Sequence, residues 1–156
     1  MFGKLFVGVI PCNHPNKKRA KTWFRPYETN FIVGARTFLK DLKKQGFKLA
    51  LVTGSAHSEI KKILPERIYN LFEVIVTGSD VKNGKPHPEP YLKAIKALKI
   101  KKTQAIVIEN APFGIKSAKT AGLKCYAIET SLPKKYLKQA DKIFENIKSL
   151  RRGDSA

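Results

Sequence analysis

The stretch Lys48-Leu-Ala-Leu-Val-Thr53, which continues into Gly54 and Ser55, is the segment that decides the fold. Its run is almost continuously apolar, as is typical of a parallel strand covered by helices on both faces. It then changes abruptly to small and hydroxyl residues. The sequence therefore predicts a buried parallel strand over 48–53, followed by a polar loop that leads into a helix.

The same alternation of apolar runs and helical patterns continues along the chain from residue 31 onward. The sequence predicts further strands over 72–77, 105–108, 124–128 and, as a short fifth, 142–144. It predicts helices over 38–46, 55–64, 90–98 and 114–121. Strands separated by helices of about ten residues form βαβ crossovers. The expected fold class is therefore α/β, a three-layer Rossmann-like sandwich around a parallel sheet.

The two ends of the chain differ from this core, which we place at 31–150. In the region 1–30, residues 4–10 suit a strand, and residues 11–27 contain three prolines and a basic run that are typical of an irregular arm. Residues 151–156 are expected to form a flexible tail. The apolar run at 2–10 is too short to span a bilayer and is wrongly flanked for a signal peptide. We therefore expect a cytoplasmic protein with no membrane partner.

The net charge of +19 results from 31 Lys and Arg against 12 Asp and Glu. An excess of this size is compatible with an anionic partner such as a nucleic acid. The lysines are spread through every expected helix, however, without a stripe of interleaved aromatic residues, which favours a solvated basic surface. Cys12 and Cys125 have no ligand-like spacing, so both are predicted to be free thiols.

Three short segments lie where ligands bind in such sheets, at or after the carboxyl ends of strands. Thr53-Gly54-Ser55 can cradle an anion with hydroxyl and backbone N–H groups, or Ser55 or Ser58 can simply cap the next helix. Lys85, between Gly84 and Pro86, is either a stiffly placed ammonium for a phosphoryl group or an ordinary surface lysine.

The third segment is Glu109-Asn110, at the end of the strand predicted over 105–108. Two oxygen-bearing side chains at a strand end can hold a hard cation such as Mg²⁺. The alternative is that Asn110 caps the following helix.

In this order and spacing, the three segments resemble a known family. Gly46 to Ser55, Val74 to Tyr91 and Ile106 to Gly122 are similar to the second, third and fourth signatures of the haloacid dehalogenase superfamily. The resemblance extends from about Val33 to Leu150 and favours the branch of β-phosphoglucomutase and phosphoglycolate phosphatase. It implies a phosphatase or phosphomutase-type hydrolase for a small phosphorylated metabolite, with the cap domain absent or vestigial.

The resemblance also implies a role for each candidate residue. In the family, an aspartate after the first strand attacks phosphorus, and a second aspartate acts as acid and base. Thr53 would bind the phosphoryl oxygens together with Gly54 and Ser55. Lys85 would offset the developing negative charge, and Glu109 and Asn110 would hold Mg²⁺.

The sequence departs from the family at two points. No Asp-x-Asp-Gly motif is present, because the first aspartate is Asp41, and the N-terminal apolar run is followed by Pro11-Cys12-Asn13-His14. Asn110 stands where the family usually has aspartate. We therefore expect weak Mg²⁺ binding and little or no activity from this chain alone.

Three functional hypotheses stay open. Residues 1–30 could be the remnant of a cap domain in a truncated or split hydrolase, whose upstream segment or partner chain supplies the first strand and its aspartates. Alternatively, residues 4–10 fill the central strand position in a catalytically inactive protein that binds phosphate or another protein, with residues 11–14 where the nucleophile loop would be. The third hypothesis is a basic nucleic-acid-associated protein.

Overall fold

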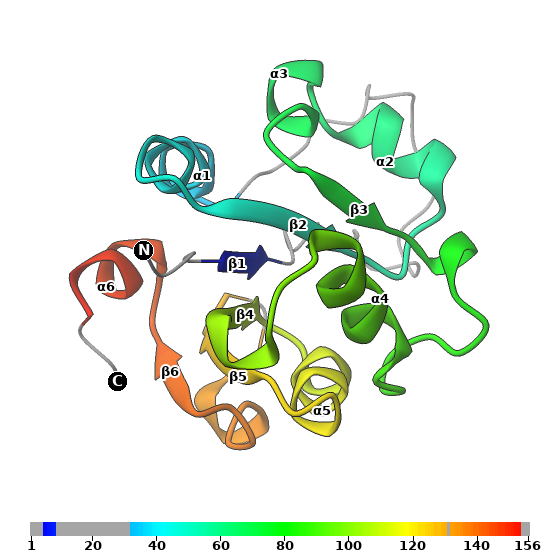
Figure 1. Ribbon diagram of the computed structural model, residues 1–156. Coiled ribbons are helices and arrows are strands. Elements are labelled where there is room, and N and C mark those ends of the chain that lie inside the picture. Colours follow the sequence, from blue (N-terminus) through cyan, green and yellow to red (C-terminus); the bar gives the residue numbers. More distant parts are fainter. Residues whose placement is uncertain (1–4, 9–31, 131, 154–156) are drawn as a thin grey trace, which may run out of the picture.

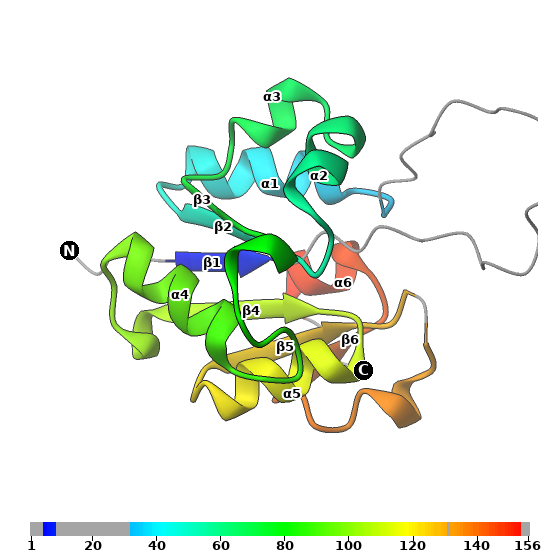
Figure 2. The ribbon, with the colours of Figure 1, turned by 90° about the vertical axis from the view of Figure 1, so that its right-hand side faces the viewer.

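The protein is built around one parallel sheet of six strands (Figure 1). The computed structural model describes residues 5–8, 32–130 and 132–153. The strand order is β3-β2-β1-β4-β5-β6, and the arrows of neighbouring strands run the same way (Figure 2). The strands are β1 (Leu5–Gly8), β2 (Lys48–Val52), β3 (Val74–Val76), β4 (Ala105–Glu109), β5 (Lys124–Ile128) and β6 (Lys142–Phe144).

Helices cover both faces of the sheet, so the predicted three-layer α/β fold is confirmed. Along β2, Ala50 and Val52 face the core cluster that includes α4 and α5, whereas Leu49 and Leu51 belong to the cluster on the other face. Both faces are buried, which explains the continuous apolar run. The helices are α1 (Ala35–Lys44), α2 (His57–Ile63), α3 (Glu66–Tyr69), α4 (Glu89–Leu98), α5 (Pro112–Thr120) and α6 (Ile147–Arg152).

The central position of the sheet is occupied by β1, which pairs with β2 on one side and with β4 on the other. The prediction that the segment 4–10 forms a strand there is therefore confirmed for residues 5–8. Without β1, both neighbouring strands would expose unpaired inner edges. The predicted arm over 11–27 and the residues 11–14 lie outside the described part of the chain.

All four predicted helices begin at other residues than the sequence predicted, since α1 begins at Ala35 and α4 at Glu89. For the other two the structure shows the cause. Helix α2 begins at His57 and not at Ser55, because Ser55 belongs to a loop in which its backbone carbonyl accepts a hydrogen bond of 3.0 Å from the Gly78 amide. Helix α5 begins at Pro112 and not at Gly114, since proline suits the first turn of a helix.

Two further helices, α3 and α6, were not predicted. Helix α6 continues to Arg152, so two residues of the expected tail are helical. The Arg151 guanidinium pairs with the Asp41 carboxylate of α1 at 2.7 Å, which ties the end of α6 to the rest of the protein. This pair joins residues 110 positions apart and leaves no periodic signal in the sequence.

Among the described residues, no helix has the length and apolar character that crossing a bilayer requires. Cys125 is a buried free thiol, as predicted, and burial raises its pKa. Cys12 lies outside the described residues, and the cytoplasmic location stays a prediction.

Gly78 allows the loop after β3 to pack against the loop after β2. A Cβ atom at this position would lie 2.4 Å from the Gly54 backbone oxygen, which is too close for any real contact. We expect Gly78→Ala to lower the free energy of unfolding by about 1–3 kcal/mol, as overpacking does. Urea denaturation measures the change.

The matched control is Gly84→Ala, because a Cβ at Gly84 would meet nothing within 4 Å. This change is expected to stay within about 0.5 kcal/mol of the parent protein. Equal stabilities of the two variants would show that the loops after β2 and β3 separate at little cost.

Candidate functional site

The three predicted segments meet at the edge of the sheet where the strands end. The Lys85 ammonium lies 3.1 Å from the Val52 carbonyl oxygen, at the end of β2 and directly before Thr53. The same ammonium pairs with the Glu109 carboxylate at 2.8 Å, at the end of β4. Lys85 therefore connects the loop after β2 with the end of β4, although it comes from the loop after β3.

The loop that carries Lys85 is organised by Glu89, the first residue of α4. The Glu89 carboxylate accepts hydrogen bonds from the Lys82 amide at 2.8 Å and from the Asn83 amide at 3.0 Å. The hydrogen bond from the Lys82 amide is the main cause of the lowered pKa of Glu89. The Lys85 side chain is only 15% exposed. Lys85 is therefore not an ordinary surface lysine, which was the alternative interpretation.

The Glu109 carboxylate is buried, with 2% of the residue exposed, and both of its oxygens are fully engaged. Oε1 accepts hydrogen bonds from Lys85 Nζ at 2.8 Å and from the Tyr91 hydroxyl at 2.7 Å. Oε2 accepts hydrogen bonds from the backbone amides of Asn110 at 3.0 Å and Ala111 at 3.3 Å. A buried carboxylate needs such compensation, because the isolated charge would lose its hydration.

Glycine at position 114 makes room for this carboxylate. A Cβ atom on Gly114 would lie 1.8 Å from Glu109 Oε1, so no other residue fits there without displacing the acid. The first turn of α5 is therefore shaped around Glu109.

Tyr91 is a site residue whose role the sequence did not reveal. The apolar spacing of α4 correctly places its ring in the core, where the residue is fully buried. Its hydroxyl bonds Glu109, and its ring lies 5.1 Å from the Lys85 ammonium. Burial raises the pKa of Tyr91 well above its usual value, and the nearby Glu109 charge adds to this shift. The one signal in the sequence was that a buried tyrosine hydroxyl needs a hydrogen-bond partner.

The Thr53-Gly54-Ser55 loop lies beside Lys85. The Thr53 hydroxyl oxygen accepts a hydrogen bond of 3.2 Å from the Ser55 amide, which makes a tight local turn. Gly54 is exposed and its two neighbours are half-buried, so an anion in solution can reach the loop. The alternative that Ser55 or Ser58 caps α2 is wrong, because Ala56 precedes the helix and no side chain caps it.

Asn110 is nearly buried, with 8% of the residue exposed. Its side-chain amide donates a hydrogen bond of 3.1 Å to the Thr130 hydroxyl, in the segment after β5. The alternative that Asn110 caps α5 is wrong, because the residue before the helix is Ala111. Sequence reasoning did not find Thr130, since no motif links two loops that follow different strands.

The described residues do not fit the Mg²⁺ site that the family resemblance implies. The Glu109 oxygens already accept four hydrogen bonds, and Asn110 supplies no charge. Within the described ranges, no group of three His, Cys, Asp or Glu side chains could hold a metal ion. The roles of Glu109 and Asn110 as metal ligands therefore stay a prediction.

The end of β1 is where the family places its nucleophile. The last residue of β1, Gly8, lies level with Leu51 of β2 and Ile108 of β4, and the next residue in the chain is Val9. The first 27 residues of the sequence contain no Asp or Glu. This chain therefore carries no carboxylate directly after its central strand.

Comparison with known proteins agrees with this architecture. The family model described as haloacid dehalogenase-like hydrolase matches residues 13–128. The validoxylamine A 7′-phosphate phosphatase of Streptomyces hygroscopicus subsp. limoneus is 34% identical over 121 residues, which are 77% of this chain and 57% of that protein. The glycerol-1-phosphate phosphohydrolase 1 of Saccharomyces cerevisiae is 36% identical over 69% of this chain and 46% of its own length. This chain thus spans about half the length of the curated relatives that it matches.

Comparison with solved structures also finds similar proteins. A β-phosphoglucomutase-like protein from Bacteroides vulgatus superposes with a TM-score of 0.68 at 32% identity, over 79% of this chain and 51% of that chain. A phosphoglycolate phosphatase-like protein from Haemophilus somnus, at 23% identity, has a TM-score of 0.71 over 78% of this chain and 56% of its own, and supports the fold alone.

Removal of the Tyr91 hydroxyl tests how strongly Glu109 depends on its donors. We expect Tyr91→Phe to lower the free energy of unfolding by about 1.5–3 kcal/mol, because a hydrogen bond to a buried charge is lost. Tyr136→Phe removes a hydroxyl from a tyrosine that is 52% exposed and should change stability by less than about 0.5 kcal/mol. Chemical denaturation of both variants measures the difference. A Tyr91→Phe protein as stable as the parent would mean that Glu109 does not need this donor.

Proposed function

Because the chain belongs to the haloacid dehalogenase-like hydrolase family, we propose that it forms the phosphoester-binding core of a phosphatase or phosphomutase-type hydrolase. The observation that carries this proposal is the position of Lys85. Its ammonium lies 3.1 Å from the carbonyl oxygen that precedes Thr53-Gly54-Ser55, although the two segments are about thirty positions apart in the chain. A fixed cation beside an exposed loop with hydroxyl groups suits a phosphoryl group.

In this proposal, the loop and the lysine share the binding of the phosphoryl oxygens. Thr53 and Ser55 contribute hydroxyl groups, and exposed Gly54 lets the ligand approach the backbone. Lys85 contributes a positive charge held by Glu109 and by the Val52 carbonyl. Two of the relatives are named as phosphate-ester phosphatases, and a third, PpaX of Bacillus cereus, is named a pyrophosphatase and is 35% identical over 60% of this chain and 44% of its own length. We infer a small phosphorylated metabolite as the substrate class.

We further propose that the chain has little or no hydrolytic activity alone, because its sequence has no Asp-x-Asp-Gly motif. Groups that stabilise an anion can leave some catalysis without a nucleophile, but far less than the complete set. A second segment or partner chain could supply the missing carboxylates. Since β1 already pairs with both neighbouring strands, such a segment would not add a strand between β2 and β4.

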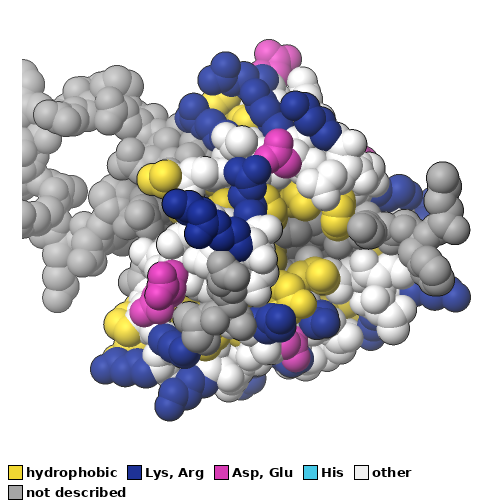
Figure 3. Space-filling model, turned by 90° about the vertical axis from the view of Figure 1, so that its left-hand side faces the viewer, with side chains coloured by type: hydrophobic (Ala, Val, Ile, Leu, Met, Phe, Trp, Pro, Cys, Tyr) yellow, Lys and Arg dark blue, Asp and Glu magenta, His cyan; other side chains and the backbone are white. Residues whose placement is uncertain are grey.

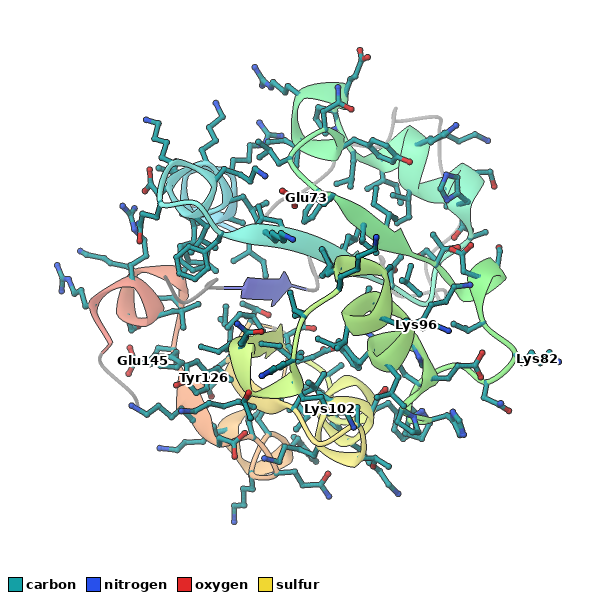
Figure 4. All side chains as sticks on the ribbon, viewed as in Figure 1. Glu73, Lys82, Lys96, Lys102, Tyr126 and Glu145 are labelled. Atoms are coloured by element: carbon teal, nitrogen blue, oxygen red, sulfur yellow. The ribbon has the colours of Figure 1, made fainter. Side chains whose placement is uncertain are left out.

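Phosphate binding tests the proposed roles of Lys85 and the loop. Inorganic phosphate added to ¹⁵N-labelled protein is expected to shift the amide resonances of Gly54 and Ser55. Lys85→Gln, which keeps a polar group beside Glu109, should weaken phosphate binding by about 10-fold or more, because a charge-assisted contact is lost. Lys82→Gln is the matched control, since the exposed Lys82 side chain points outward from the same loop (Figure 4). Equal dissociation constants for the two variants would contradict the proposal.

Hydrolysis of an aryl phosphate with Mg²⁺ tests whether the chain is inactive alone. We expect the same background rate from the parent protein, Lys85→Ala and Lys85→Gln, and no calorimetric signal of Mg²⁺ binding at millimolar metal. The physical reason is that Glu109 has no free acceptor position and that no aspartate follows β1. Activity that is present in the parent protein and absent in both Lys85 variants would reveal a nucleophile within this chain.

A further inference from the structure

The end of the sheet where the strands begin carries a second group of positive charges, far from Lys85 in the topology. Lys48, Lys124 and Lys142 are the first residues of β2, β5 and β6, and all three are exposed. Lys101 and Lys102 are exposed in the segment that leads into β4. Because all strands are parallel, these five lysines share one end of the protein, which we call the strand-start surface.

Contacts between the elements show that this surface is continuous. Lys48 Nζ lies 3.5 Å from the Leu98 carbonyl oxygen, which places the start of β2 beside the end of α4. The Lys102 side chain lies against Gly122, before the start of β5. The Cys125 amide of β5 donates a hydrogen bond of 2.7 Å to the Asp141 carboxylate, next to the start of β6. The lysines therefore line adjoining segments of one surface and are not scattered single charges.

The salt bridges that the structure shows at this end are Asp41–Arg151, Glu73–Lys43 and Asp141–Lys119, and they do not include the five strand-start lysines. Lys124 nevertheless lies close enough to Asp141 to act on its carboxylate electrostatically. Among the described residues, Lys and Arg also cover more of the side of the molecule that carries α1 and α6 than Asp and Glu do (Figure 3). The strand-start surface thus carries five exposed lysines that take part in none of these salt bridges.

Helix geometry explains only part of this charge. Lysines in the last turn of a helix interact favourably with the negative end of the helix dipole, which accounts for Lys43, Lys44, Lys96 and Lys119. None of the strand-start lysines lies in the last turn of an α-helix, and Lys102 belongs to the short 3-10 helix Lys102–Gln104 that precedes β4. Lys48 also interacts favourably with a helix end, because its ammonium lies 3.5 Å from the carbonyl oxygen of Leu98, the last residue of α4. Helix ends do not account for Lys101, Lys124 and Lys142, which bring like charges together and suit an external anion.

We propose that the strand-start surface binds the phosphate backbone of a nucleic acid without reading its sequence. Lysine ammonium groups spread over adjoining segments suit repeated phosphates, and they release counterions when they bind them. The exposed large apolar side chains of the described residues lie elsewhere, at Val33, Leu92, Phe113, Leu132 and Tyr136. The described part of this surface therefore offers neither an aromatic platform for bases nor an apolar anchor for a lipid bilayer. This proposal is independent of the phosphoester site, which lies at the other end of the strands.

Binding of a fluorescent DNA duplex of mixed sequence tests the proposal on the full chain. We expect affinity to fall steeply with salt, and Lys101→Glu, Lys102→Glu and Lys124→Glu together to weaken binding by about 10-fold or more. The triple variant should also make the slope of log K against log salt shallower by about 3. The matched control is the triple variant Lys116→Glu, Lys134→Glu and Lys138→Glu, which changes the net charge by the same amount at positions outside the strand-start surface. Circular dichroism confirms that both variants are folded.

Each outcome of this experiment either supports or overturns the proposal. A much larger loss of affinity in the strand-start variant than in the control supports the proposal. Equal losses would show that the net charge and not this surface attracts DNA, and would overturn it. Absence of salt-dependent binding by the parent protein, or tighter binding to phosphatidylserine vesicles than to the duplex, would overturn it as well.

Discussion

The buried carboxylate of Glu109 is the constraint on which the rest of the site depends. An ionised acid can remain in the interior only if several donors surround it, and here they come from three parts of the chain. Lys85 comes from the loop after β3, Tyr91 from α4, and two backbone amides precede α5. Gly114 completes the arrangement, because any side chain at that position would occupy the space of the carboxylate. One charge thereby sets the relative positions of two loops and two helices.

The same arrangement separates two functions that the family usually combines at this place. Lys85 is held beside the Thr53 loop because Glu109 binds it, and this favours an anion. Both carboxylate oxygens of Glu109 already accept hydrogen bonds from donors within the protein. The neutral Asn110 side chain donates a hydrogen bond to the Thr130 hydroxyl. The chemistry of the described residues therefore suits the phosphoryl group that we propose better than a metal ion. The metal ligands and the nucleophile would have to come from carboxylates that the first 27 residues do not contain.

Parallel topology gives the protein two chemically different ends. At the carboxyl ends of the strands, polar loops converge, and their charges are paired and partly buried, as for Lys85 and Glu109. At the amino ends, exposed lysines accumulate where Lys48, Lys124 and Lys142 open three strands. We propose a small anion in a fixed position as the ligand of the first end and the phosphate backbone of a nucleic acid as the ligand of the second.

The sequence by itself determined the fold class, most of the strands and the three segments of the candidate site. Apolar runs and helical spacing are local signals, so the strand over 124–128 and the core position of Tyr91 could be predicted from them. Only the tertiary structure decided that Lys85 is held by Glu109 and that Tyr91 serves their ion pair. It also decided where α2 begins, because a contact between Ser55 and the distant Gly78 outweighs the local capping preference. The physical reason is the same in each case: hydrogen bonds between distant segments leave no periodic trace in the chain.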